Sequence, residues 1–310
     1  MLRSERFAKA RPHVIALAIV ALAAMACLGW WIGHRTGPAE ITARPALWHV
    51  TQGSREAYLF GTIHAVPKNE VWLSPVIARA VERSDVLILE VTGLERERRS
   101  RDIFERLGRS SGLPPVPERL DAADAQRFRA IESRYPSDLH GLAGYESWAA
   151  ALLVNASVST DLSLSTENAG EAVLSGKFGE QGKSAEGLET IEGQLGLFDR
   201  LSEADQRTLL TQAVREAGDA PRLYRDLYSA WSRGDVAGLE RQFLAPFASA
   251  PTLRHVLIDE RNRHWSVVID RRLRSRSEVP FIAVGTGHLL GSSGLPERLT
   301  KLGWRVERLQ

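Results

Sequence analysis

The chain has 310 residues, of which 44% are hydrophobic and 25% charged, and its formal net charge is +2. These values are ordinary for a globular protein, and because basic and acidic residues are interspersed, the charge gives no support for nucleic-acid binding. Cys27 is the only cysteine and lies in an apolar N-terminal stretch. The rest of the chain therefore has no disulfide, no thiol nucleophile and no cysteine metal ligand.

The N-terminal segment is predicted to be a membrane anchor. Residues 14–32 carry no charge and are numerous enough to cross a bilayer as a helix. Four basic residues precede them: Arg3, Arg6, Lys9 and Arg11. This arrangement favours a cytoplasmic N-terminus and an exported remainder. We expect residues 1–33 to be a single-pass anchor in a bacterial inner membrane, 34–45 a linker, and the main domain to lie in the periplasm or outside the cell.

Two other interpretations of this segment stay open. Ala24-Met25-Ala26 resembles a signal-peptide cleavage site, and cleavage there would release a secreted domain. Lipid modification of Cys27 is the other alternative, although Ala24 stands where such sites favour leucine.

The domain proper is expected to open with a hairpin. Two strand-like runs, 46–50 and 57–61, flank a turn at Gly53-Ser54. Ser74 is the expected N-cap of the helix that follows. Residues 86–91 form a near-continuous apolar run, which suits a strand covered on both faces of a parallel sheet.

Residues 94–250 are predicted to be a helical insertion. Helical patterns fill most of it, at 122–135, 145–154, 203–217 and 223–233. Only 184–188 reads as a strand. The insertion could cover a cleft or form one of its walls, or it could pack without any role in substrate binding.

The last part of the sequence is expected to repeat the strand, turn, helix, strand order with which the domain begins. A long helix at 253–273 precedes a strand at 281–284, a short helix at 295–302 and a last strand at 304–309. The sequence thus predicts an α/β (α+β) fold. Its central mixed sheet is built from two strand–GxxH–helix–strand units, with the helical insertion between them.

The GxxH motif occurs twice, as Gly61-Thr62-Ile63-His64 and as Gly285-Thr286-Gly287-His288. Both follow a strand-like run, and open α/β sheets bind ligands at the carboxyl ends of their strands. A neutral imidazole is a common metal ligand and a general base near neutral pH. We therefore expect His64 and His288 to meet in one composite site.

Glu90 is the predicted third member of this site. It ends the most apolar run of the chain, where a carboxylate is costly unless it is paired or binds a cation. Alternatively, it is a strand-terminal glutamate that reaches water. Two histidines and one carboxylate match the ligands of catalytic zinc and of other divalent ions, although their spacing is no compact motif.

Other polar residues are weaker candidates. Arg261, on the long helix, could bind a carboxylate or stabilise a developing oxyanion; alternatively, Arg261 and Arg263 are two surface arginines of an Arg-rich helix. Glu189 follows a predicted strand and could face the same cleft. His255 and His264 are expected to serve packing or solvent contacts. The remaining histidines have no supporting context: His13, His34, His49 and His140.

Motifs along nearly the whole chain beyond the linker resemble the TraB/PrgY/GumN family, which includes the Tiki proteases. They occur in family order: Leu47-Trp48 through Gly61-Thr62-Ile63-His64, Ser84-Asp85, Leu89-Glu90, Gly187-Leu188-Glu189-Thr190 with Gln194, Trp231 with Gly234-Asp235, Arg261-Asn262 with Trp265, and Val284-Gly285 with Gly287-His288-Leu289. One departure is Ser165-Thr166-Glu167, where relatives often read Gly-Val-Asp.

The resemblance implies that residues 46–310 form a membrane-tethered or secreted, metal-dependent peptidase-like domain. By position, His64, His288 and Glu90 would be its metal-site residues and Arg261 its functional arginine. Manganese or cobalt is favoured as the ion, and zinc is compatible. The wider kinship includes erythromycin-esterase-like and haem-binding ChaN-like proteins.

The resulting hypothesis is an exported metal-dependent hydrolase that acts on a peptide or protein. An unassigned carboxylate would serve as its base. The first alternative is a non-catalytic envelope protein that binds haem, a metal or a peptide in the same cleft. The second is a scaffold with a degenerate site.

Overall fold

The computed structural model describes residues 43–93, 97–162 and 164–310, which divide into two compact units. The sheet unit comprises residues 43–93, 164–190 and 222–310, and the helical unit comprises 97–162 and 191–221. The predicted anchor at 1–33 lies outside these ranges. Within them, no helix combines the length and the hydropathy that a bilayer-crossing segment needs.

The sheet unit is built on a six-stranded mixed sheet with the order β6-β4-β7-β2-β1-β8. Its strands are β1 (Leu47–Gln52), β2 (Arg55–Thr62), β4 (Val86–Val91), β6 (Ser184–Glu189), β7 (Pro280–Gly285) and β8 (Arg305–Arg308). β6, β4, β7 and β2 run parallel, whereas β1 pairs antiparallel with β2 and with β8. The mixed α/β architecture and the predicted β1–β2 hairpin are confirmed. The hairpin turns at Gly53, whose positive φ of 61° suits glycine.

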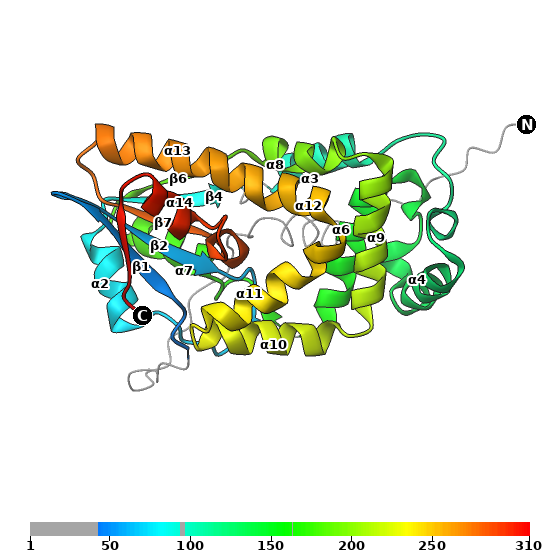
Figure 1. Cartoon of the computed structure of the whole chain (residues 1–310). Coiled ribbons are helices and arrows are strands. Elements are labelled where there is room, and N and C mark those ends of the chain that lie inside the picture. Colours follow the sequence, from blue (N-terminus) through cyan, green and yellow to red (C-terminus); the bar gives the residue numbers. More distant parts are fainter. Residues whose placement is uncertain (1–42, 94–96, 163) are drawn as a thin grey trace, which may run out of the picture. The chain divides into compact units, whose positions relative to one another are not determined.

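Helices pack on both faces of this sheet (Figure 1). One face carries α2 (Pro75–Arg83), α7 (Gly170–Glu180), α10 (Ala220–Ser232) and α11 (Val236–Leu244); the other carries α13 (Glu260–Ser275) and α14 (Leu295–Lys301). The Ser74 side chain caps α2 by accepting a hydrogen bond from the Ile77 amide, as predicted. A separate ribbon pairs β3 (Val66–Pro67) with β5 (Leu164–Ser165).

Alternation along the strands divides the core in two. Phe60 and Phe281 face the α2 and α7 side, where Phe178 and Trp231 also pack. The α13 face is filled by apolar residues that include Leu59, Ile88, Ile282, Trp265 and Leu299. Because Glu90 lies two residues beyond Ile88 on the same strand, its side chain projects toward α13.

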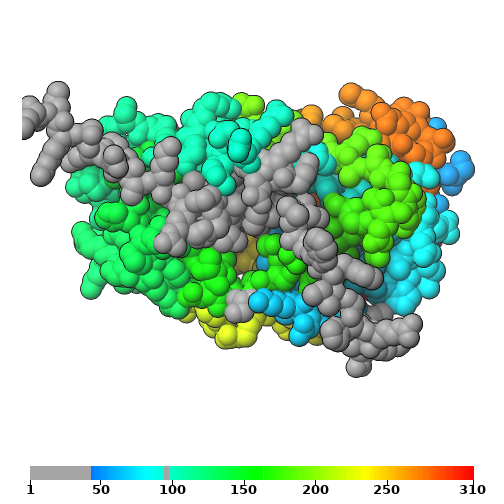
Figure 2. Space-filling view, turned by 180° about the vertical axis from the view of Figure 1, so that it is seen from behind, coloured from blue at the N-terminus to red at the C-terminus, as the bar shows by residue number. Residues whose placement is uncertain are grey.

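The predicted helix at 253–273 is interrupted by a π-helical turn. Pro251–Arg254 forms α12, His255–Asp259 is π-helical, and α13 follows. The Glu260 amide bonds to the carbonyl of His255, five residues back. Such bulges shift the register of the helix that follows, often at functional sites. The opposite, C-terminal end of α13 is exposed, and it is coloured orange in Figure 2.

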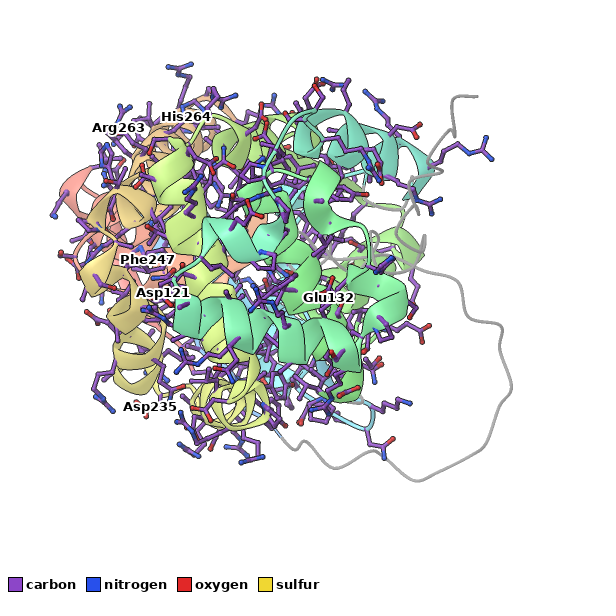
Figure 3. The ribbon with its side chains drawn as sticks, turned by 90° about the vertical axis from the view of Figure 1, so that its right-hand side faces the viewer. Asp121, Glu132, Asp235, Phe247, Arg263 and His264 are labelled. Atoms are coloured by element: carbon purple, nitrogen blue, oxygen red, sulfur yellow. The ribbon has the colours of Figure 1, made fainter. Side chains whose placement is uncertain are left out.

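The helical unit consists mainly of α3 (Glu97–Gly108), α4 (Ala122–Arg134), α6 (Ser147–Ser159), α8 (Ile191–Asp199) and α9 (Glu203–Ala217). Nearly every residue of α6 is buried, so this helix forms the centre of the unit. Asp121 and Ser202 cap α4 and α9 through their side chains. Asp121 and Glu132 mark the two ends of α4 in Figure 3.

Residues 164–190 and 222–250, which lie inside the predicted insertion, belong to the sheet unit. Residues 164–190 do so because β6 pairs with β4 at the edge of the sheet and α7 packs against both strands. Residues 222–250 do so because α10 and α11 contribute Trp231 and Leu239 to the core on one face of the sheet. The short helical turns of the two units are Val116–Arg119, Pro136–Leu139, Leu142–Gly144, Thr160–Leu162, Ala245–Ser249 and Thr286–Leu289.

Candidate active site at the carboxyl edge of the sheet

The four parallel strands bring four polar residues to one edge of the sheet. β6 ends at Glu189 and β4 contains Glu90 next to its end. His288 follows β7 and His64 follows β2. Since these strands are neighbours and parallel, their carboxyl ends lie side by side, where α/β sheets place ligands.

The two GxxH turns are tied to each other. The Thr286 hydroxyl donates to the carbonyl of Thr62 at 2.9 Å. A Cβ at Gly61 would lie only 2.9 Å from Oγ1 of Thr286. Glycine at this position therefore permits the close approach of turns that are more than 220 residues apart in the sequence.

Arg261 is the centre of the first half of the site, and each of its five N–H groups has an acceptor. Nε and Nη2 donate to the two oxygens of Glu189 at 3.0 and 2.9 Å. Nη2 also donates to Oε1 of Glu90 at 2.5 Å. Nη1 donates to the carbonyl of Leu257, inside the π-helical turn, and to Nε2 of His288 at 3.2 Å. The guanidinium is thus saturated by partners from this chain.

The charges of Arg261 and Glu90 are both buried, so each is stabilised by the other. The Arg261 and Glu90 side chains are 9% and 11% exposed. Burial alone would raise the pKa of Glu90, but the Arg261 charge outweighs it and holds the pKa at about 2. Glu90 is therefore a carboxylate at any physiological pH. Its Oε2 accepts the Gly285 amide at 3.3 Å.

His288 is held on three sides. Its Nδ1 lies 2.7 Å from Oδ1 of Asn262, and the amide nitrogen of Asn262 donates to the carbonyls of His288 and Ser293. The ring packs on Trp265, with centroids 4.4 Å apart. Because Arg261 has no acceptor, Nε2 must accept from it and Nδ1 must carry the proton. Burial and the Arg261 charge lower the pKa of His288 to about 3, so the ring is neutral.

The predicted metal ligands do not form a ready metal site. Glu90 and His288 approach each other, with 3.9 Å between Oε2 and Nε2. However, the Nε2 lone pair that would bind an ion already accepts the Arg261 N–H, and Oε1 of Glu90 pairs with the same guanidinium. Across residues 43–93, 97–162 and 164–310, no group of three His, Cys, Asp or Glu side chains is arranged to hold a metal.

His64 forms the second half of the site, with Thr62 and Glu171. Its Nδ1 lies 3.1 Å from Oε1 of Glu171, which also accepts the Thr62 hydroxyl at 2.5 Å. The histidine–glutamate contact has ion-pair distance without hydrogen-bond alignment. In the described structure, Nδ1 of His64 and Oε2 of Glu171 are buried without a hydrogen-bond partner. Burial would lower the pKa of His64, but Glu171 and, more weakly, Glu90 raise it.

Glu171 was not predicted from the sequence, and Asn262 and Trp265 were noted only as parts of a family motif, with no role at the site. Glu171 comes from the N-terminus of α7, and no local pattern singles it out. Asn262 and Trp265 lie near Arg261 on α13 and share its helical face, which was a usable signal. Glu189, predicted only as a residue that could face the cleft, is bound by Arg261 and by the Trp265 indole. Glu167, at the departure from the family pattern, is exposed.

The other candidates lie elsewhere. Arg263 and His264 are exposed on α13 and lie at the surface in Figure 3. His255 and His140 are exposed as well, and His49 pairs with Glu56 at 2.7 Å on the β1–β2 hairpin. Arg263 pairs with the neighbouring Glu260, whereas Arg261 is buried, so the two arginines are not both surface residues. His13 and His34 fall outside the described residues.

Comparison with known protein families matches residues 46–308 to the TraB/PrgY/gumN family. No curated protein and no solved structure matches the chain. The family match covers the whole sheet and helical parts described above, and both GxxH turns.

Proposed function

The chain belongs to the TraB/PrgY/gumN family, and on that premise we propose that it is a hydrolase of the cell envelope, with a peptide or protein as substrate. The reacting centre would be the edge of the sheet where three neighbouring strands end: Glu90 lies next to the end of β4, and His288 and His64 follow β7 and β2. The peptide specificity rests on the resemblance to the Tiki proteases.

One observation carries this proposal: a buried, charged network stands next to an accessible imidazole. Arg261, Glu90 and Glu189 are each at most 15% exposed, and such charges are costly to bury. The ring of His64 is 30% exposed beside them. His64 lies within electrostatic range of Glu90 and of His288, because its charge affects the pKa of both. Charged groups gathered in this way at strand ends are typical of active sites.

We assign roles from these contacts. His64 would exchange protons with water and with the leaving group, because 30% of its side chain is exposed although its Nδ1 is buried. Arg261 would position Glu90, Glu189 and His288, since its five N–H groups leave none for a substrate carboxylate.

The expected divalent ion, manganese, cobalt or zinc, stays a prediction. In the arrangement described, His288 and Glu90 would have to release Arg261 before they could bind an ion. We therefore derive no step through a metal. Elemental analysis of the purified full-length chain, compared with His64→Ala and His288→Ala, tests whether an ion is bound and by which residues.

The activity is tested with a library of internally quenched peptides, with and without added Mn²⁺, Co²⁺ or Zn²⁺. We expect cleavage by the full-length chain and a loss of at least about 100-fold in His64→Ala, the usual scale for general acid–base catalysis. Circular dichroism should show an unchanged fold. Wild-type turnover in this variant would contradict the proposal.

Haem binding, the alternative hypothesis, receives less support from the contacts of His288. Axial ligation of iron needs a free ring nitrogen, whereas both nitrogens of His288 have partners. A non-catalytic peptide-binding role is the alternative that a negative cleavage assay would favour.

A further inference from the structure

We infer that Glu171 is a positioning residue that pairs with His64 and directs the open nitrogen of the imidazole toward water. This inference deepens the proposed function, because it gives His64, the proposed base, a carboxylate partner. It rests on the proposed hydrolase activity for its catalytic consequence only. The pairing itself is a geometric property of the folded chain.

The carboxylate of Glu171 is placed by contacts on one of its oxygens. Oε1 accepts the Thr62 hydroxyl at 2.5 Å and lies 3.1 Å from Nδ1 of His64. Thr62 belongs to the same GxxH turn as His64, so two residues of this turn contact the Glu171 carboxylate. The Glu171 residue is 9% exposed, which makes an unpaired role for its charge costly.

Two adjacent buried atoms lack hydrogen bonds: Nδ1 of His64 and Oε2 of Glu171. Native proteins rarely leave such atoms unsatisfied, and the exceptions cluster at functional sites. Nδ1 of His64 lies at ion-pair distance from the Glu171 carboxylate, while 30% of the His64 side chain is exposed. We therefore take Nδ1 to be the nitrogen that pairs with Glu171 and Nε2 the one that faces water.

The start of helix α7 brings Glu171 close to His64 and Thr62. Glu171 lies in the first turn of α7, an 11-residue helix whose N-terminal dipole favours a negative charge. Gly170 precedes it, and a Cβ at Gly170 would lie 2.6 Å from Cγ2 of Thr62. Glycine therefore lets the start of α7 touch the GxxH turn.

No other carboxylate of the site is equally placed. Oε1 of Glu90 and both oxygens of Glu189 are engaged by Arg261. Glu167 precedes α7 and is exposed. Of the described acidic residues, only Glu171 forms an ion pair with His64.

The hydrolytic step balances without a further reactant. The oxygen of water bonds to the amide carbon of the substrate while one water proton passes to Nε2 of His64. Glu171 stabilises the resulting imidazolium through Nδ1–H, as the carboxylate does in a catalytic triad. The proton then passes to the amide nitrogen as the C–N bond breaks, which yields a carboxylic acid and an amine.

The test compares Glu171→Gln with Glu167→Gln in the full-length chain. Both changes remove one negative charge, and they lie four residues apart. We expect Glu171→Gln to lower kcat by about 100-fold or more, to leave KM nearly unchanged and to alter the pH profile of kcat/KM. Glu167→Gln should behave as wild type. Thr62→Val, which removes the hydroxyl that holds Glu171, should lower kcat to a smaller extent.

A second measurement does not depend on activity. The ¹⁵N chemical shifts of the His64 ring should report a proton on Nδ1 in the wild type and a changed tautomer balance in Glu171→Gln. If no peptide is cleaved but this difference appears, the proposed function fails and the pairing stands. Unchanged ring shifts, or wild-type kcat and pH profile in a folded Glu171→Gln, would overturn the inference.

Discussion

Arg261 shows how one side chain organises a buried site. Its planar fork donates to two carboxylates, one imidazole and one backbone carbonyl. Lysine cannot reproduce this geometry, because an ammonium is a point charge with three donors. The residue matters for its shape as much as for its charge.

Arg261→Met is predicted to be strongly destabilising. It would leave Glu90 and Glu189 buried without a countercharge, which costs about 3–5 kcal/mol in comparable cases. Arg261→Lys should lie between this variant and the wild type. Urea unfolding monitored by tryptophan fluorescence measures both. Arg263→Met is the control, since its solvent-exposed pair with Glu260 should contribute little to stability. Equal losses for the two methionine variants would contradict this prediction.

The lowered pKa values of His288 and Glu90 predict that the folded state becomes less stable in acid. The pKa of His288 falls from 6.5 to about 3 on folding, and that of Glu90 from 4.5 to about 2. In both cases the unfolded chain binds the proton first. The stabilisation is therefore complete above pH 6.5 and is lost progressively as the pH falls through the folded pKa values.

His288→Gln should flatten this dependence. Between pH 6.5 and 4.5, the wild type should lose up to about 1.4 kcal/mol of unfolding free energy per pH unit from His288 alone. The variant, although less stable at neutral pH, should lose less. Denaturant midpoints measured at half-unit pH intervals, with a chelator present, give the slope of stability against pH for each protein. His264→Gln, an exposed change on α13, is the control; identical slopes in all three proteins would refute the assignment.

At the scale of elements, the site depends on how closely turns and helix ends approach. β2 and β7 lie side by side, and their turns touch at Gly61 and Thr286. The start of α7 touches the same turn at Gly170. Glycine at both contacts reflects the lack of room for a side chain.

Gly61→Ala is predicted to destabilise the fold by about 1–3 kcal/mol, because the added methyl group would overpack a junction made of backbone and short side chains. Gly176→Ala is the matched control. It lies in the exposed middle of α7 with nothing within 4 Å of the added Cβ, and it should stabilise by about 0.5–1 kcal/mol. Thermal unfolding distinguishes the two signs. If Gly61→Ala stabilised the fold as Gly176→Ala does, the two GxxH turns would have room for the added methyl group, and this prediction would be wrong.

The elements also show the limits of sequence reasoning. The two GxxH turns and the apolar run that ends near Glu90 predicted that His64, Glu90 and His288 lie at one edge of the sheet, because parallel strands end at a common edge. It could not predict Glu171, whose place is decided by how α7 packs on another turn. Nor could it predict the saturation of Arg261, since the partners Glu189 and Leu257 are brought there by an edge strand and a π-helical turn.

At the scale of the whole molecule, the order of secondary structure was largely predictable and its division into units was not. Apolar periodicity located most helices and strands correctly. Residues 164–190, predicted as part of the helical insertion, belong to the sheet unit. The strand within them was predicted, but because β6 is polar and exposed along most of its length, the sequence gives little sign that it pairs with β4.

The predicted anchor concerns the whole chain as well. The full-length protein should sediment with membranes and resist alkaline extraction. Leu22→Arg combined with Ile19→Arg should release it, since each arginine costs about 2.5–3.5 kcal/mol at the centre of a spanning helix. Leu309→Arg, an exposed position in the sheet unit, should have no effect. A mature mass that lacks the first 26 or so residues would instead support signal cleavage.

The bond between Thr286 and Thr62 has a consequence for biosynthesis. A ribosome makes Thr62 long before Thr286, and β7 must insert between β2 and β4, which are already complete. Contacts of such long range form late in folding. A nascent polypeptide that stops short of Thr286 would consequently lack the paired turns, so any hydrolytic capacity would emerge only after β7 and the turn that follows it have been made.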